Sequence, residues 1–277
     1  MNIKVKHIDT EEGCELLAEF LDSQINRLVE LEPDLRCSEV GRMSSIHPLY
    51  SSIIEDCISI RVLGENGRLN QAYILTRAFL ERLINYCFLQ IAPNHEYENF
   101  MDYSKNKAGR RLSRSMEVYG EVKAKLEYRK GEYELPDDVR EAVEKFTSER
   151  GREKTRWTKL GLPERAAVIE KETGKSSLFM HLLSVYGDAS EAIHGTLYGA
   201  LFHFGVYDPG STPHDQKSLD KQRFSTLSML YLVCGSAIDT LFFLLLGIGD
   251  QNVQEAASES SAGFKVVAVK TGLAQAK

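Results

Sequence analysis

The stretch that decides the fold is Phe224–Gly249, which reads FSTLSMLYLVCGSAIDTLFFLLLGIG. It is about as long as a membrane span and carries one charge, Asp239. A charge at the centre of a span costs roughly 2.5 to 3.5 kcal/mol, whereas each Leu, Phe or Ile returns only about 0.3 to 0.6 kcal/mol. We predict a central helix of a soluble bundle in which Asp239 finds a partner. A membrane span over residues 224–249 is the alternative, with a cytoplasmic flank formed by Lys217, Lys221 and Arg223.

Outside this stretch, apolar residues recur mainly at helical spacing. Asp9 and Glu12 form a capping-box pattern that opens a first helix, and Pro33 is expected to end it. A second helix begins near Pro48, and a third runs from about Leu69 to Ile91. No alternation typical of strands and no repeat period is found. The sequence therefore predicts an all-α fold, a helical bundle.

The charge distribution suggests how the chain is organised. Between Lys105 and Lys159, sixteen Lys and Arg stand against eleven Asp and Glu, although the whole chain has a net charge of −6. We predict one helical domain over residues 1–250 that contains a charged helical insertion over about 96–162. Residues 251–277 are mostly small and polar, and we predict that they form a flexible tail.

The composition is that of a globular cytoplasmic protein. Of the 277 residues 43% are hydrophobic, which is enough to build a large core, and the N-terminal residues lack the apolar segment of a secretory signal. The five cysteines form no Cys-x-x-Cys pair and mostly have apolar neighbours, which predicts buried thiols in a reducing compartment. The negative net charge means that binding to nucleic acid or anionic lipid has to be local.

Polar residues interrupt two otherwise apolar helical segments. Arg77 and Glu81 stand four residues apart and so share one helix face, and a later segment carries Tyr186, Ser190 and His194 at the same spacing. We predict that Arg77, Glu81 and His194 lie together in the bundle interior. The group is either a structural ion pair with a core histidine, or a catalytic site. In a catalytic site Arg77, held by Glu81, steadies an anion while His194, beside Ser190, acts as general acid or base.

The charged insertion places basic side chains around Trp157, the only tryptophan of the chain. Cations interleaved with an aromatic ring suit phosphate contact combined with base stacking. A solvated pair of charged helices is the alternative interpretation. The candidate RNA-binding residues are Arg110, Arg111, Arg114, Lys154, Arg156 and Trp157, with Arg152 and Lys159 nearby.

The motifs of the common enzyme classes are missing from the sequence. There is no Gly-rich phosphate loop for a dinucleotide or nucleoside triphosphate, no Gly-x-Ser-x-Gly elbow and no His-Glu-x-x-His step. Glu191 and His194 form a single Glu-x-x-His step, whereas a di-iron bundle uses two. We therefore predict no metal and no cofactor. Arg42 and His47 match the short Arg-to-His motif of HEPN ribonucleases, a spacing that arises easily by chance among seven histidines.

Three segments carry a resemblance to a known family: TRAFLERLINYCFL, RWTKLGLPERAAVIEKETG and SEAIHGTLYG, which lie between about Pro48 and Phe204. Together they resemble a bacterial family of helical proteins described as a domain of unknown function. The resemblance implies that its signature positions here are Arg77, Glu81, Trp157, Ser190 and His194. It also implies a distant likeness to HEPN-type and abortive-infection proteins, and hence a link to RNA or to bacterial defence.

Two functions stay open at this point. One is an RNA-directed effector, either a metal-independent ribonuclease or an RNA-binding protein, acting in defence or stress. The other is a non-catalytic module with a structural polar core that binds a protein partner or a second copy of itself. The charged insertion favours the first, and neutralisation of Arg77 by Glu81 favours the second.

Overall fold

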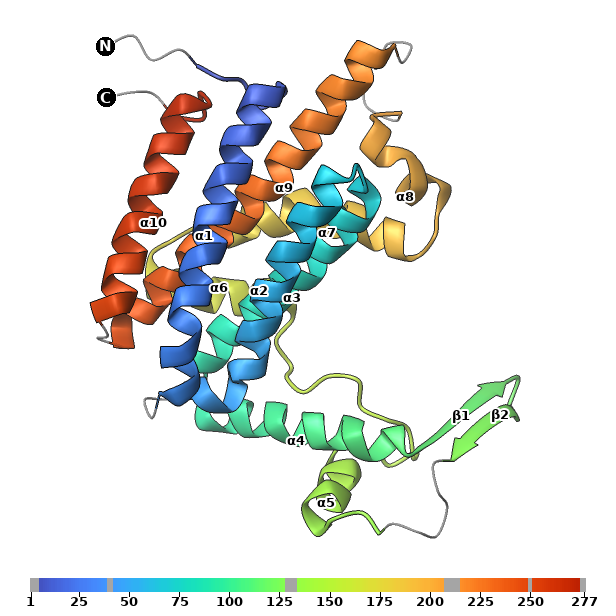
Figure 1. Cartoon of the computed structure of the whole chain (residues 1–277). Coiled ribbons are helices and arrows are strands. Elements are labelled where there is room, and N and C mark those ends of the chain that lie inside the picture. Colours follow the sequence, from blue (N-terminus) through green and yellow to red (C-terminus); the bar gives the residue numbers. More distant parts are fainter. Residues whose placement is uncertain (1–4, 39–41, 128–133, 207–214, 249–250, 275–277) are drawn as a thin grey trace. The chain divides into compact units, whose positions relative to one another are not determined.

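The structure is a computed structural model that describes residues 5–38, 42–127, 134–206, 215–248 and 251–274 (Figure 1). Most of these residues lie in helices, and one small two-stranded sheet is present among them. The high helix content confirms the predicted all-α class. The chain forms α1 (Glu11–Cys37), α2 (Met43–Glu65), α3 (Leu69–Ile91), α4 (Asn94–Arg111), β1 (Ser113–Val118), β2 (Glu121–Glu127), α5 (Asp137–Lys145), α6 (Leu162–Thr173), α7 (Leu178–Ile193), α8 (Leu197–Leu201), η1 (Phe202–Phe204), α9 (Gln216–Leu245), η2 (Leu246–Ile248) and α10 (Gln251–Lys270).

The chain divides into two compact units. Unit 1 contains residues 1–90 and 162–277, and unit 2 contains residues 91–161. Unit 1 therefore holds α1 to α3 and α6 to α10, whereas unit 2 holds α4, the β1–β2 hairpin and α5. Unit 2 spans nearly the same residues as the predicted charged insertion.

The core of unit 1 forms around α1 and α9. Helix α1 packs against α2, α9 and α10, and Figure 1 shows it between α10 and α2. Gly235 lets α9 approach α1 closely, because a Cβ at this position would lie 2.5 Å from the ring of Phe20. The fully buried side chains of α9 include Leu230, Cys234, Ala237, Ile238, Leu241 and Phe242. Most of the driving force for folding this unit comes from such apolar burial.

Asp239 lies in this core and has partners, as predicted. Its carboxylate lies 3.0 Å from the ammonium of Lys175 and accepts a 2.8 Å hydrogen bond from the hydroxyl of Ser260. That hydroxyl in turn accepts a hydrogen bond from the side-chain amide of Gln24. Among the described helices, α9 alone is long and apolar enough to cross a membrane, and 83% of its apolar window is buried within the protein.

Three local predictions are wrong in unit 1. Residues 251–270 form α10, because Val253, Ala256, Ala257 and Ser260 fall on one face of a helix and bury that face. They are not a flexible tail. Helix α1 continues past Pro33 to Cys37, since a proline so near the end of a helix removes only one hydrogen bond of its last turns. Cys37 is exposed, while the other four cysteines are buried as predicted.

Unit 2 contains strands where none was predicted. β1 and β2 pair in antiparallel fashion, and the turn between them has positive φ at Tyr119 (54°) and Gly120 (81°). Two consecutive residues with positive φ are typical of a tight hairpin turn, and glycine adopts this conformation readily. The alternation of side chains along each strand is short and lies within a highly charged stretch, which hides it from a search for apolar periodicity.

Candidate nucleic-acid interface

Unit 2 rests on close packing between α4 and α5. Gly109 of α4 makes this possible, because a Cβ there would lie 2.9 Å from a methyl group of both Val139 and Val143. Nearer the start of α4, the ring of Tyr103 meets the ring of Phe146 edge to face, with the ring centres 5.2 Å apart. Phe146 is buried and directly follows α5. The packing therefore fixes the point at which the chain leaves α5.

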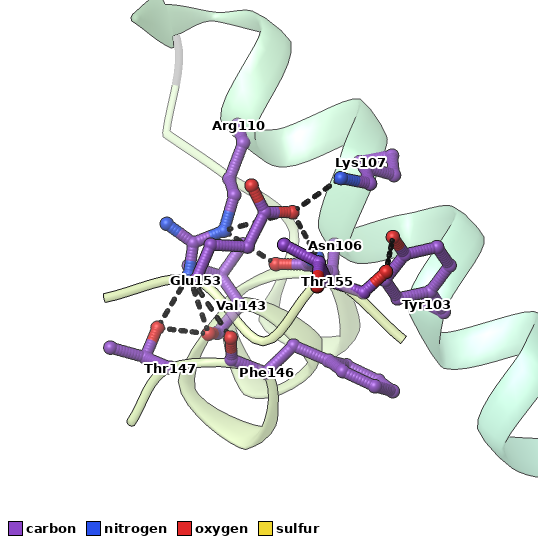
Figure 2. Close-up of polar contacts among 9 residues, drawn as sticks. All are labelled: Tyr103, Asn106, Lys107, Arg110, Val143, Phe146, Thr147, Glu153 and Thr155. Atoms are coloured by element: carbon purple, nitrogen blue, oxygen red, sulfur yellow. Dashed lines mark hydrogen bonds and ion pairs between the residues drawn. The ribbon is translucent and has the colours of Figure 1, made fainter. Parts of the chain in front are cut away.

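Arg110 holds the end of α5 against α4 (Figure 2). Its guanidinium donates hydrogen bonds to the hydroxyl of Thr147 at 2.6 Å and to the carbonyls of Val143 and Phe146 at 3.5 and 3.4 Å. The same group donates to the buried side chain of Asn106 at 2.8 Å. Carbonyls at the C-terminal end of a helix have no partner within the helix, and a cation suits them.

Glu153 fixes the segment that follows. Its carboxylate accepts hydrogen bonds from Lys107 at 2.7 Å and from Asn106 at 3.2 Å, and it lies 3.8 Å from Arg110 (Figure 2). The hydrogen bond from Lys107 holds the pKa of Glu153 below its usual value. Tyr103 donates to the backbone carbonyl of Thr155 at 2.8 Å. We call Tyr103, Asn106, Lys107, Arg110, Thr147 and Glu153 the clamp, because together they bind residues 147–155 to α4.

Beyond the clamp, the chain borders a hollow of about 730 Å³. Three separate segments of unit 2 form its lining. They are the first turns of α4 with His95, Glu96 and Asn99, the end of α5 with Lys145 and Phe146, and the segment with Lys154, Arg156, Trp157, Thr158 and Lys159. Trp157 is partly exposed, and its ring packs edge to face on Phe100 with the centres 5.2 Å apart.

The lining of the hollow is strongly cationic. Four lysine and arginine side chains border it against one carboxylate, that of Glu96. Lys145 is paired with Asp102 at 2.7 Å, and Lys154 donates to the carbonyl of Lys145 at 2.9 Å. Arg156 and Lys159 make no side-chain hydrogen bond or ion pair within the described ranges. The hollow therefore combines the aromatic ring of Trp157 with cationic groups whose N–H donors are available to a ligand.

The structure brings together only part of the predicted RNA-binding set. Lys154, Arg156 and Trp157 line the hollow, whereas Arg110 is occupied by the clamp. Arg111 and Arg114 line a second hollow of about 510 Å³, with Leu112 and Leu126, at the base of the hairpin. The lining residues from α4 and α5 could not be predicted from the sequence, because only tertiary packing brings them next to Trp157.

The predicted Arg77–Glu81 contact exists, and it belongs to a seam between helices. The guanidinium of Arg77 lies 3.2 Å from Glu81, donates to the hydroxyl of Tyr186 at 3.0 Å and stacks 4.1 Å from the centre of the same ring. One turn further, Asn85 accepts a hydrogen bond from Arg165 of α6. The polar face of α3 thus joins α3 to α6 and α7.

His194 does not lie in the interior, so this prediction is wrong. Helix α7 ends at Ile193, and Gly195 adopts a left-handed conformation (φ 68°) that terminates helices. His194 therefore occupies the exposed C-cap position. Ser190 is half-buried, and the described contacts join neither Ser190 nor His194 to the side chains of Arg77 and Glu81.

The Arg42 and His47 side chains serve contacts within unit 1. Arg42 donates to the backbone carbonyl of Leu89 at 2.7 Å, and the imidazole of His47 lies 2.7 Å from the carboxylate of Glu32. No three His, Cys, Asp or Glu side chains in the described part of the chain are grouped so that they could hold a metal ion.

Residues 44–211 match the model of a family of unknown function, DUF5677. The chain belongs to DUF5677. The match runs from α2 to beyond η1, so it contains the hollow and the α3 seam but not α1, α9 and α10. Helix α2, which lies inside the matched range, therefore packs against α1 and α9, which lie outside it. No curated protein and no solved structure matches the chain.

Proposed function

We propose that this DUF5677 protein binds single-stranded RNA through the hollow of unit 2. The observation that carries the proposal is the set of Lys154, Arg156 and Lys159 around Trp157. Proteins that bind single strands combine a cationic surface for the phosphates with aromatic rings on which bases stack. RNA is the proposed polymer because of the family resemblance described above.

The roles of the residues follow from their contacts. Arg156 and Lys159 have guanidinium and ammonium hydrogens available for phosphate oxygens, and Trp157 offers a stacking surface at the same hollow. The clamp holds residues 147–155 against α4, and Arg156 and Trp157 directly follow this fixed segment. A surface that is ordered before binding loses less conformational entropy when the ligand arrives.

The test measures binding of a fluorescein-labelled oligouridylate by anisotropy, with Trp157 fluorescence as a second readout. Arg156→Glu should weaken binding by about tenfold or more, while the charge-matched control Arg150→Glu, exposed and outside the hollow, should weaken it less than threefold. Three phosphate contacts predict a slope of about −2 for log K against log salt. Arg156→Ala should reduce this slope by about 0.7.

If Arg156→Glu and Arg150→Glu weaken binding equally, RNA responds only to the overall charge of the protein and does not bind at the hollow. Absence of binding by the parent protein at low salt would remove the proposal. Tight binding of double-stranded RNA in place of single strands would also contradict it, because a stacked and paired base cannot reach Trp157.

Cleavage of RNA by His194 stays a prediction. Because His194 is exposed, His194→Gln should leave the fold unchanged and allow a clean comparison with the parent protein in EDTA. Loss of 10² to 10⁴-fold in cleavage would support a general acid or base role. Equal cleavage by both proteins, or none by either, would leave RNA binding as the function.

A second candidate function is self-association through α7, α8 and η1. Large apolar side chains are exposed along this segment, including Leu183 (78%) and Leu197 (71%). Clustered exposed apolar residues are typical of interaction sites. If a second copy covers them, light scattering should report a dimer for the parent protein and a monomer for Leu183→Glu.

A further inference from the structure

We propose that the hollow prefers guanine, and that Glu96 recognises the base by accepting hydrogen bonds from its N1–H and 2-amino groups. The inference rests on the proposed function, because it names the base that RNA would place beside Trp157. Cations and an aromatic ring do not distinguish one base from another. Base identity has to come from a group that reads hydrogen-bond donors and acceptors at the base edge.

Glu96 is such a group, and its carboxylate lacks donors. It lies in the first turn of α4 and lines the hollow, and its side chain is only 14% exposed. One carboxylate oxygen, Oε2, is buried without a hydrogen-bond partner, and Oε1 lies 3.8 Å from the exposed His95. Because Oε2 is buried, a base in the hollow reaches both oxygens only when the side chain of Glu96 turns toward the hollow. A carboxylate removed from water is unfavourable unless hydrogen bonds replace the lost hydration.

The local sequence explains why the helix itself does not supply a donor. Glu96 stands three residues after the N-cap, the position from which a glutamate can accept from the N-cap backbone N–H. The N-cap here is Pro93, which has no N–H. The usual partner of a glutamate at this position is therefore missing, and the carboxylate is left for a ligand.

Guanine fits this carboxylate better than the other bases. Its Watson–Crick edge carries two adjacent donors, N1–H and the 2-amino group, which match the two oxygens of a carboxylate. Adenine and cytosine place an acceptor nitrogen beside their amino group, and uracil places carbonyls on both sides of its single N–H. Asn99, which is one turn along α4 and also lines the hollow, carries an amide that can donate to guanine O6.

The test uses five labelled heptamers of uridine whose central residue is G, inosine, A, C or U. We expect the G heptamer to bind the full-length protein about tenfold more tightly than the A, C and U heptamers. Inosine lacks the 2-amino group, so its heptamer should have an intermediate affinity. Glu96→Gln should abolish the preference, so that its affinities for the G and all-U heptamers become equal, whatever the change in its overall affinity for RNA. Glu98→Gln removes the same charge from an exposed neighbour outside the hollow and should keep the preference.

The outcomes separate the two proposals. Equal affinity of the parent protein for all five heptamers would overturn the guanine preference and leave RNA binding intact. Failure of every heptamer to bind would overturn both. A guanine preference that survives in folded Glu96→Gln would remove Glu96 from recognition. The comparison among heptamers uses the parent protein, so it holds even if the variant does not fold.

Discussion

The guanidinium of Arg110 and the hydroxyl of Thr147 lie 2.6 Å apart, and this contact joins α4 to the residues that follow α5. An arginine in a basic cluster is therefore a structural part of unit 2. Arg110→Ala would remove the hydrogen bonds that the guanidinium gives to Thr147 and Asn106, although the carbonyls of Val143 and Phe146 keep the hydroxyl of Thr147 and the backbone N–H of Lys154 as donors. We therefore expect the free energy of unfolding of unit 2 to fall by about 1 to 2 kcal/mol. Urea unfolding followed by Trp157 fluorescence reports this unit selectively. Arg111→Ala, at the exposed next position, should change it by less than about 0.5 kcal/mol.

Two glycines in helices should respond to alanine in opposite directions. At Gly109 the new methyl group would meet Val139 and Val143 at 2.9 Å, so Gly109→Ala should destabilise unit 2 by about 1 to 3 kcal/mol. At Gly187 nothing lies within 4 Å of an added Cβ, so Gly187→Ala should stabilise α7 by about 0.4 to 1 kcal/mol. Thermal unfolding of the two variants and the parent measures both. A stabilised Gly109→Ala protein would mean that α4 and α5 pack less closely than described.

His181 should make unit 1 sensitive to mild acid. Burial lowers its pKa to about 4, whereas an unfolded histidine titrates near 6.5. Between these values the unfolded state binds the extra proton, so stability should decrease as the pH falls from about 6.5 to 4, by roughly 3 kcal/mol in all. Urea unfolding at several pH values should show a steeper loss for the parent protein than for His181→Leu. Parallel pH profiles would show that His181 is not buried as a neutral base.

Asp239 distinguishes a core helix from a membrane span. Asp239→Leu makes α9 more apolar, yet it removes the partner of Lys175 and of Ser260. In a packed core we expect the free energy of unfolding to fall by about 2 kcal/mol, and Lys175→Met in the same protein to restore part of it. Circular dichroism during urea unfolding measures both variants. An Asp239→Leu protein that is recovered only from membranes by detergent would support the span instead.

The sequence predicted the parts of the fold that depend on apolar periodicity. The bounds of α3 agree with the prediction, and Asp239 has the partners that its place in an apolar helix required. The β1–β2 hairpin was not predicted because the side chains of its strands, where the structure describes their burial, are all exposed. The alternation along these strands therefore has no buried apolar face that a sequence search could detect. Helix α10 was not predicted because small residues such as Ala256, Ala257 and Ser260 are typical of flexible tails. Only packing against α1 and α9 buries them as one face of a helix.

The site was predictable only where its residues are neighbours in sequence. Lys154, Arg156 and Trp157 were found together because they occur in one segment. Glu96 and Lys145 reach the same hollow from two different helices, and no spacing rule connects positions so far apart. The contacts of Arg110 within unit 2 could not be predicted, because a sequence shows the charge of a guanidinium and not the carbonyls that surround it. His194 was misplaced because the helix ends one residue before it.

The β1–β2 hairpin also bears on how the protein behaves at high concentration. Each strand has the other on one side only, so the outer side of each presents backbone N–H and C=O groups to water. Such edges can pair with strands of other molecules and start aggregation. Lys123 and Lys125 lie in β2, and charges of this kind on an edge oppose pairing with another chain. Their replacement by uncharged β-branched residues would remove this protection against fibrous self-assembly.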